Sequence, residues 1–497
     1  MKNSERAPTK LEKKTAAPLM ALLAFTACSS TNAQLPVVAP RNVIFILSDD
    51  HRYDFMGFHP NAPAWLQTPA LDRMAAGGAH VQNAFVTTAL CSPSRASILT
   101  GRYAHRHGVV DNTSPIPRDT AFFPQYLRKA GYRTAYIGKW HMGEDAESDR
   151  PRVGFDHWIS FRGQGVYNDP ELNINGERRQ VKGYTTDILT DSAIAWMKEQ
   201  SGARDRRPFF LYLSHKAVHA EFEPSPRHRG RHANDAIPYP ESMANTAANY
   251  RDKPRWVAEQ RNSWHGVDFM YHGQFEFDPF YRRYAETLLA LDDSVGRVLD
   301  FVDGSGLARN TLVIYMSDNG FLLGEHGLID KRNAYEESIR VPMLAYAPGF
   351  ITAGSQVPAV VRNIDVAPTI LDVADVRSDH DMDGRSVLPA LRGQPLPTEG
   401  ELLYEYYWEY AFPHTPTTFA LRGDRYKFIF YHGIWDVNEF YDLQADPRER
   451  HNLIGVPAHR AKIEEMRTRL FDRLQAGGGM QVPVRRGSWQ AAERRPQ

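Results

Sequence analysis

The sequence predicts an α/β fold, with a large, mostly parallel sheet sandwiched by helices and a smaller C-terminal α+β subdomain that contains an antiparallel sheet. Three observations support this prediction. Short apolar runs alternate along the chain with helical patterns, as in parallel sheets covered on both faces. Several of these runs end abruptly in charged or polar residues. Beyond about residue 397, closely spaced short strands replace the alternation.

We therefore expect four segments along the chain. Residues 1–33 form an export signal, residues 40–396 form the main domain, residues 397–480 form the C-terminal subdomain and residues 481–497 form a flexible tail. The main domain contains a long segment without periodicity, from about residue 214 to residue 280, and such a length inside a compact domain indicates a functional loop.

The first residues resemble a bacterial export signal. A positively charged stretch precedes the apolar run AAPLMALLAFTA, which is too short to cross a bilayer. The run ends in FTACSS, which resembles a lipobox with Cys28 as the lipidated first residue, although Phe25 replaces the usual leucine. Cleavage after Ala33, which would leave a soluble protein, is the alternative. We favour the lipid anchor, and in both cases expect a protein of the periplasm or outer membrane of a Gram-negative bacterium.

Charge and cysteine content narrow the function classes. The 59 basic and 59 acidic residues give no net charge, so we expect no nucleic-acid partner. The chain has two cysteines. Because Cys28 is either lipidated or removed, Cys91 has no intramolecular partner, and it is either a small buried hydrophobe or a reactive or modified group.

The elements of the main domain follow in order. NVIFILS (residues 42–48) predicts a buried strand, and residues 68–85 predict a helix closed by two glycines and then a strand. Residues 94–105 predict a helix, residues 123–143 a helix, a glycine stop and a strand, and residues 208–219 a buried strand. The 3-4-3 spacing of apolar residues in 281–302 predicts an amphipathic helix, and TLVIYMS (311–317) repeats the first strand pattern.

In the C-terminal subdomain, residues 402–408, 417–423, 425–431 and 439–443 predict short antiparallel strands, and residues 458–474 predict an amphipathic helix. Ligands of parallel sheets bind beyond the carboxyl ends of the strands. The polar residues at the ends of the predicted parallel strands are Asp49, Asp50, Lys139, His141, His215, His219, Asp318 and Asn319. We expect these side chains to converge on one site.

CSPSR, which begins at Cys91, fits the pattern C-x-P-x-R and is followed by LTGR. With SDDHR, GKWHMG, SHKAVH and SDNGFLLGEHGLIDKR in the same order, it resembles the type I, formylglycine-dependent sulfatases of the alkaline phosphatase superfamily. The resemblance runs from about Arg41 to about Ile454, and SHKAVHAEFEP and GEHGLIDKRNAYEESIRVP are closest in style to bacterial carbohydrate sulfatases. It implies an alkaline-phosphatase-like fold and a catalytic sulfatase domain over residues 40–396.

The resemblance implies that a formylglycine-generating maturation enzyme converts Cys91 to 3-oxoalanine, whose hydrate offers one hydroxyl to attack sulfur and another to release the sulfate. It also implies a divalent metal held by Asp49, Asp50, Asp318, Asn319 and an oxygen of the modified Cys91. These oxygen ligands suit Ca²⁺, with Mg²⁺ as the alternative.

The remaining roles also come from the resemblance. Arg95 would hold the aldehyde hydrate, Lys139 and Lys331 would bind sulfate oxygens, and His141 would act as the base. His219, rather than His215, would bind the ester oxygen and protonate the leaving group. The resemblance adds a sugar contact by two residues that flank Lys331, namely His326 and Arg332.

The expected reaction is hydrolysis of sulfate monoesters on a sulfated carbohydrate, an oligosaccharide or polysaccharide. Two alternatives remain: a phosphonate monoester or phosphodiester hydrolase of the same superfamily, and a catalytically inactive carbohydrate-binding homologue. Trp408 and Trp435 in the subdomain would either stack on sugar rings or belong to its core.

Overall fold

The computed structural model describes residues 41–143, 148–205, 207–396 and 400–483. The predicted export signal, with Cys28 and Ala33, and most of the predicted tail lie outside the described residues. Within the described part of the chain, none of the helices combines the length and the apolar character that crossing a bilayer requires.

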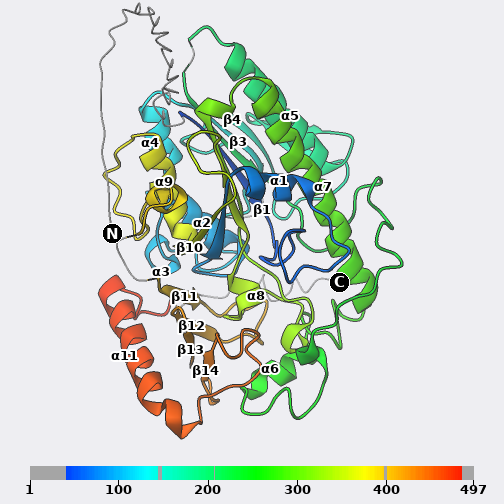
Figure 1. Ribbon diagram of the computed structural model, residues 1–497, viewed down its shortest axis with the longest axis vertical. Coiled ribbons are helices and arrows are strands. Elements are labelled where there is room, and N and C mark those ends of the chain that lie inside the picture. The colour runs from blue at the N-terminus through cyan, green and yellow to red at the C-terminus, as the bar shows by residue number, and fades with distance from the viewer. Residues whose placement is uncertain (1–40, 144–147, 206, 397–399, 484–497) are drawn as a thin grey trace, which may run out of the picture. The chain divides into compact units, whose positions relative to one another are not determined.

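A ten-stranded sheet runs through the described main domain in the order β10-β2-β9-β8-β1-β7-β3-β4-β5-β6. Figure 1 labels β1, β3, β4 and β10 of this sheet. Its strands are β1 (Asn42–Ser48), β2 (Ala79–Phe85), β3 (Arg133–Lys139), β4 (His157–Phe161), β5 (Glu171–Ile174), β6 (Glu177–Gln180), β7 (Phe209–Ser214), β8 (Thr311–Ser317), β9 (Met343–Tyr346) and β10 (Ser355–Arg362). The central strands β8, β1, β7, β3 and β4 are parallel, whereas β9, β5 and β6 pair antiparallel with their neighbours. The predicted fold class is confirmed.

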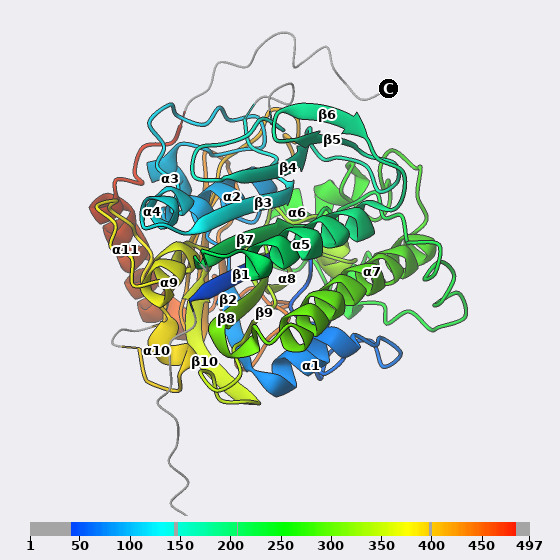
Figure 2. The same ribbon diagram turned by 90° about the horizontal axis from the view of Figure 1, so that it is seen from above.

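Helices cover both faces of this sheet (Figure 2). One face packs against α1 (Pro69–Gly77), α5 (Thr185–Gly202) and α7 (Phe277–Gly304). The other packs against α2 (Cys91–Thr100), α4 (Pro124–Lys129) and α9 (Val366–Val373). The short helices are α3 (Ala104–His107), α6 (Arg255–Glu259), α8 (Glu336–Ile339) and α10 (Leu388–Leu391).

Strand β1 shows why its sequence is continuously apolar. Val43, Phe45 and Leu47 enter the core on one face of the sheet, and Ile44 and Ile46 enter the core on the other. Because alternate side chains of a strand point to opposite faces, a strand covered on both sides needs apolar residues at every position. The same packing confirms helix α7, since every apolar residue of its predicted stripe is buried.

The predicted helix over residues 94–105 is wrong in its C-terminal half. Helix α2 ends at Thr100, because Gly101 adopts a left-handed conformation with φ of 67°. A Cβ atom at Gly101 would lie 2.9 Å from the sulfur of Met382, so there is also no room for a side chain at this position. Helix α3 begins only at Ala104.

The second sheet has the antiparallel order β11-β12-β13-β14. Its strands are β11 (Leu402–Tyr406), β12 (Thr417–Arg422), β13 (Tyr426–His432) and β14 (Glu439–Asp442), and α11 (Arg460–Gly477) packs on one face. On β11, Leu403 faces the core beside α11, whereas Tyr404 and Tyr406 join a core of the main domain. One face of the smaller sheet in the predicted C-terminal subdomain therefore packs into the core of the main domain.

Candidate active site

The register of the central strands brings their carboxyl ends to one level of the sheet. Ser48 at the end of β1 pairs with Ser317 at the end of β8, and Leu47 pairs with Ser214 at the end of β7. Strand β3 continues this alignment, because its Gly138 also pairs with Ser214. The polar residues that follow these strands are thereby delivered to one edge, as the sequence predicts.

Three buried carboxylates meet at this edge. Oxygens of Asp49, Asp50 and Asp318 lie within 4.8 Å of one another, and all three residues are at most 1% exposed. Asn319 donates from Nδ2 to Asp50 Oδ1 over 2.6 Å. Among the described residues, Asp50 Oδ2 and Asn319 Oδ1 are buried without a hydrogen-bond partner. Unpaired buried oxygens beside ionisable oxygens are what a hard divalent cation requires, so this set fits Ca²⁺ or Mg²⁺.

The protonation of these acids supports the same interpretation. Burial favours the neutral acid at Asp49, but Lys139 and Arg95 hold its pKa well below the usual value. Burial raises the pKa of Asp50 to about 7 against the opposing charge of Lys331, and burial with the charge of Asp49 raises the pKa of Asp318. A bound dication would supply the missing positive charge and keep all three carboxylates ionised.

Arg95 joins the two acidic strand ends. Its guanidinium donates to Asp49 Oδ2 over 2.9 Å and to Asp318 Oδ2 over 2.9 Å, and also to the Lys139 carbonyl and to Ser214 Oγ. The side chain is 1% exposed. Arg95 lies one turn of α2 after Cys91. Its guanidinium bonds therefore also fix the buried N-terminus of this helix against Asp49 and Asp318.

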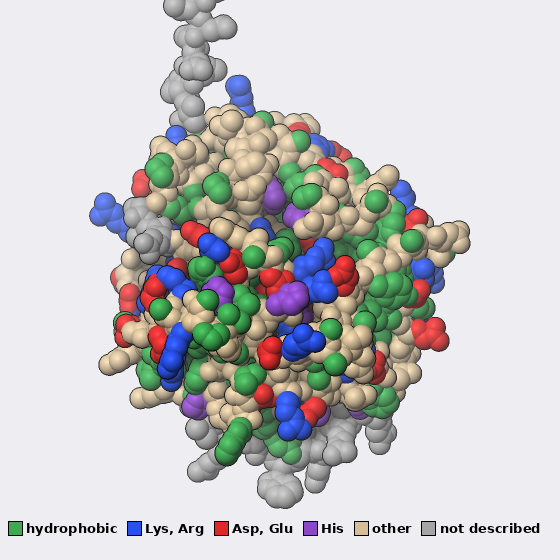
Figure 3. Space-filling model, turned by 60° about the horizontal axis from the view of Figure 1, so that its bottom comes forward, with side chains coloured by type: hydrophobic (Ala, Val, Ile, Leu, Met, Phe, Trp, Pro, Cys, Tyr) green, Lys and Arg blue, Asp and Glu red, His purple; other side chains and the backbone are tan. Residues whose placement is uncertain are grey.

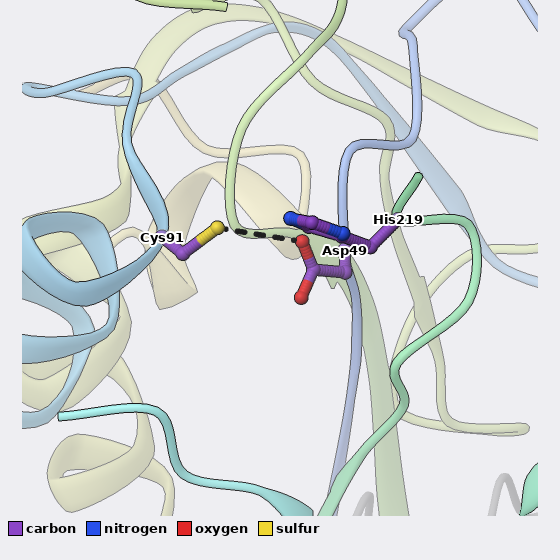
Figure 4. Close-up of side chains that lie close together, drawn as sticks. All are labelled: Asp49, Cys91 and His219. Carbon is purple, nitrogen blue, oxygen red and sulfur yellow. Dashed lines mark hydrogen bonds between the residues drawn. The ribbon is translucent and has the colours of Figure 1, made fainter. Parts of the chain in front are cut away.

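Cys91 is the first residue of α2 and faces this cluster. Its Sγ lies 3.6 Å from Asp49 Oδ1, 3.1 Å from Lys331 Nζ and 3.9 Å from Lys139 Nζ. Figure 4 shows Cys91, Asp49 and His219 arriving from three separate segments, with the sulfur directed at the carboxylate. Burial and Asp49 raise the pKa of the thiol to about 12, although both lysines favour the thiolate. An unmodified Cys91 is therefore a neutral thiol, which is a poor nucleophile.

Lys139 and Lys331 bring two positive charges to the cluster. Lys139 Nζ donates to Asp49 Oδ2 and, over 2.5 Å, to Gln164 Oε1, while Lys331 Nζ donates to Asp50 Oδ1 over 2.5 Å. Both side chains are at most 6% exposed. Two buried ammonium groups on either side of Cys91 can bind an anionic group there.

The two histidines after β7 lie in different surroundings. His219 Nε2 is 4.0 Å from Asp50 Oδ2, and its ring belongs with Asp49 and Cys91 to one group of convergent polar atoms. His215 is instead fully buried, with Nε2 3.0 Å from the hydroxyl of Ser294 in α7. Of the two, His219 lies at the cluster. The expectation that His215 converges there as well is wrong, because His215 instead ties β7 to α7.

His141 lies just beyond β3 with a positive φ of 49°. Its carbonyl accepts a hydrogen bond from Ser92 Oγ, next to Cys91, and its ring Nδ1 has no partner among the described residues. Burial and the charge of Lys139 hold the pKa of His141 well below its usual value. The ring is therefore neutral and able to accept a proton.

His326, which the sequence analysis expects to contact a sugar, is buried beside an aromatic ring. The His326 ring stacks on Tyr335 at 3.9 Å between centroids, and the residue is 2% exposed. Its positive neighbours are Lys253 and Lys427. It lies five positions before Lys331 with a left-handed φ of 56°, and both of its ring nitrogens are buried without a hydrogen-bond partner among the described residues.

Two contacting residues escaped the sequence analysis. Gln164 lies in a loop after β4, where no pattern distinguishes it, and it reaches the site through Lys139. Ser214 ends β7 and accepts from Arg95 over 2.7 Å. The sequence did contain a signal that could have identified Ser214. Ser214 is the last residue before the polar residue His215, just as Ser48 is the last residue before Asp49.

Comparisons with known proteins agree with this geometry. The sulfatase family model matches residues 41–376, and the C-terminal model of N-sulphoglucosamine sulphohydrolase matches residues 324–476. An N-acetylglucosamine-6-O-sulfatase of Bacteroides thetaiotaomicron is 33% identical over 90% of this chain and 88% of its own length. The N-acetylglucosamine-6-sulfatase of Homo sapiens is 31% identical over 79% of this chain and 72% of its own length.

Among solved structures, one protein in complex with its substrate D-glucosamine-2-N,6-O-disulfate has a TM-score of 0.81 and 31% identity. The match covers 89% of this chain and 99% of that protein. The agreement therefore includes the fold, the sequence and almost the full length of both chains. The chain belongs to the sulfatase family of sulfuric ester hydrolases.

Proposed function

We propose that the protein removes the 6-O-sulfate of a glucosamine or N-acetylglucosamine residue in a sulfated oligosaccharide or polysaccharide. The observation that carries the reaction is the position of Cys91, whose Sγ lies 3.1 Å from Lys331 Nζ and 3.6 Å from Asp49 Oδ1. The names of the similar proteins support the choice of sugar, since two act on N-acetylglucosamine 6-sulfate groups and one binds a 6-O-sulfated glucosamine.

The proposal includes conversion of Cys91 to formylglycine by a maturation enzyme. The hydrated aldehyde supplies a nucleophilic hydroxyl that a buried thiol with a pKa of about 12 does not supply. A divalent cation, Ca²⁺ in our proposal, would be held by Asp49, Asp50, Asp318, Asn319 and residue 91, and when bound it polarises sulfate oxygens.

The chain's own residues then bind the ester and move protons. Lys139 and Lys331 would hold the sulfate oxygens from two sides. Arg95, through its bonds to Asp49 and Asp318, would hold residue 91 beside these two carboxylates. After one hydroxyl of residue 91 has taken the sulfate and the alcohol has left, neutral His141 would accept the proton of the second hydroxyl, so that the C–O bond to the sulfate breaks, sulfate leaves and the aldehyde re-forms. Burial and Lys139 hold the pKa of His219 well below its usual value, but bound sulfate would offset both lysines and favour its protonated form. His219 can then protonate the leaving oxygen.

The proposal also places the protein outside the cytoplasm. We propose export through the N-terminal signal, with Cys28 as a lipid anchor and the periplasm or outer membrane as the location. Mass spectrometry of the mature N-terminus distinguishes a lipidated Cys28 from cleavage after Ala33.

The test combines mass spectrometry of residue 91 with assays. Residue 91 of protein made with a maturation enzyme should have the mass of formylglycine, and this protein should release sulfate from N-acetylglucosamine 6-sulfate. Cys91→Ala should abolish turnover, and Cys91→Ser should do so unless the host's maturation system accepts serine. Full activity of Cys91→Ala, or of protein whose residue 91 is an unmodified thiol, would contradict the mechanism.

The alternatives are separated in the same assay. A preference for phosphonate monoesters or phosphodiesters over sulfate esters would identify the first alternative. Binding of the sulfated sugar without turnover, in protein whose residue 91 is fully converted, would identify the inactive homologue. Comparing 6-O-sulfated and 4-O-sulfated sugars tests the sulfate position.

A further inference from the structure

We propose that a groove lined by the loop between β11 and β12 binds the sugar units next to the one that carries the scissile sulfate. This inference rests on the proposed function and adds an extended carbohydrate chain to it. The groove, called here the tryptophan groove, has a volume of about 630 Å³. Its walls include Trp256, Gln260, Trp408, His414, His432 and Trp435.

The tryptophan groove exposes two aromatic side chains that are not buried in the core. Trp435 is fully exposed at the turn between β13 and β14, and Trp408 is 47% exposed just after β11. The backbone beneath Trp435 is nevertheless anchored, because Asp436 Oδ2 accepts from the backbone N–H of Arg255 over 2.7 Å. The Trp408 indole N–H is likewise tied to the Pro413 carbonyl over 3.2 Å. Large aromatic faces held open in this way indicate a binding surface.

Polar groups of the same groove suit sugar hydroxyls. Gln260 is 2% exposed and donates from Nε2 to Thr415 Oγ1 over 2.9 Å. Its Oε1 and the indole nitrogen of Trp256 have no hydrogen-bond partner within the described parts of the chain. The residues that line the groove therefore include a buried unpaired acceptor and a buried unpaired donor as well as exposed indole rings, and sugars offer both hydroxyls and apolar C–H faces.

One loop connects the groove to the active site. Arg332, which follows Lys331, donates to Glu409 Oε1 over 2.6 Å and lies over the ring of Phe412 at 3.9 Å. Glu409 and Phe412 belong to the loop between β11 and β12. The same loop supplies Trp408 and His414 to the groove. The loop that lines the groove is therefore fixed to the residue next to Lys331, and this contact relates the groove to the active site.

Figure 3 shows the side of the molecule on which the C-terminal sheet and α6 come forward. Basic, acidic and histidine side chains gather near its centre, with hydrophobic side chains between them. The groove itself has both signs of charge, because Arg255 and Glu259 form an exposed pair and Asp436 lies beside them. A mixed surface of this kind favours a hydroxyl-rich, moderately charged chain rather than a purely anionic one.

The test compares substrates of two lengths: N-acetylglucosamine 6-sulfate and a tetrasaccharide that ends in the same 6-sulfated residue. In Trp408→Ala/Trp435→Ala, the KM for the tetrasaccharide should rise about tenfold with kcat unchanged, the loss expected for two aromatic contacts. The KM for the monosaccharide should stay within about twofold, because it does not reach the groove. Trp408→Phe/Trp435→Phe should restore most of the tetrasaccharide affinity, and Met480→Ala, an exposed residue outside the groove, should change nothing.

A tetrasaccharide KM within about twofold of wild type in the double alanine variant would overturn the proposal. If wild type hydrolyses neither compound, the proposed function fails, and calorimetric titration of the tetrasaccharide tests the groove alone. Binding that the double alanine variant loses would support the groove, and no binding to wild type would overturn it. A dimer in solution that Trp435→Asp converts to a monomer would assign the groove to a second copy, which also overturns the proposal.

Discussion

The ammonium group of Lys331 lies 3.1 Å from the sulfur of Cys91, although 240 positions separate the two residues in the chain. Lys331 also donates to Asp50 Oδ1 over 2.5 Å and is 4% exposed. This contact joins the N-terminus of α2 to the segment after β8. It places a positive charge where the sulfate of a substrate bound to residue 91 has to lie.

We predict that Lys331→Ala lowers kcat/KM for sulfate esters by about a hundredfold, because it removes a buried positive charge beside the reacting group. Lys331→Arg should retain part of the activity, since it keeps the charge with altered geometry. Lys198→Ala, at an exposed position of α5, is the matched control and should be silent. Steady-state kinetics measure all three, and an unimpaired Lys331→Ala would exclude sulfate binding by this residue.

Metal binding should stabilise the fold as well as support activity. Titration of the chelated protein with Ca²⁺ should raise the free energy of unfolding, by about 2.7 kcal/mol at 100 times the Kd. Calorimetric melting with and without Ca²⁺ measures this effect independently of turnover.

Asp50→Ala removes a carboxylate next to the unpaired Asn319 Oδ1, so Ca²⁺ should no longer shift its melting temperature. The wild-type response to Mg²⁺ in the same experiment decides between the two ions. An identical melting temperature of the wild type with chelator, Ca²⁺ and Mg²⁺ would refute the metal site.

The two histidines after β7 should differ in what their substitution changes. His219→Asn should lower kcat by at least about a hundredfold with little effect on stability, because it removes a proton donor at the site. His215→Asn should instead lower the free energy of unfolding by about 1–3 kcal/mol, since it disturbs a buried bond to Ser294. Urea unfolding together with kcat separates the two effects, and the opposite assignment would follow if His215→Asn alone abolished turnover.

The pH dependence of stability should include a contribution from His105. Its Nδ1 lies 2.7 Å from Glu405 Oε2, and its Nε2 lies 2.9 Å from the Gly477 carbonyl at the end of α11. Burial lowers the pKa of His105, but the hydrogen bond and the charge of Glu405 outweigh it and raise the pKa above the usual value. The stabilisation is therefore complete below about pH 6.5 and is lost as the pH rises through the folded-state pKa.

His105→Gln should remove this contribution, so that the variant loses about 1 kcal/mol relative to wild type at acidic pH and less at alkaline pH. Urea unfolding of both proteins across this range measures the difference. His432→Gln changes an exposed histidine at the end of β13 and serves as the control. A His105→Gln deficit that grows with pH would contradict the assigned ion pair.

The sequence by itself determined which segments are central strands and which residues follow them. A strand covered on both faces must be apolar at every position, so NVIFILS and TLVIYMS are recognisable without a structure, as are Asp49, Asp50, Asp318 and Asn319 behind them. The motif around Cys91 and Arg95 added the chemistry, because its residue types and spacing resemble one family.

Tertiary structure decided what those residues contact. Strand order and register bring Gln164 to Lys139 and Ser214 to Arg95, and neither pairing leaves a periodic signal in the chain. His326, five positions before Lys331, stacks on Tyr335 and has Lys253 and Lys427 as its positive neighbours, contacts that no local pattern indicates. Local patterns encode burial and strand ends because those depend on near neighbours, whereas side-chain partners depend on which distant segments the fold packs together.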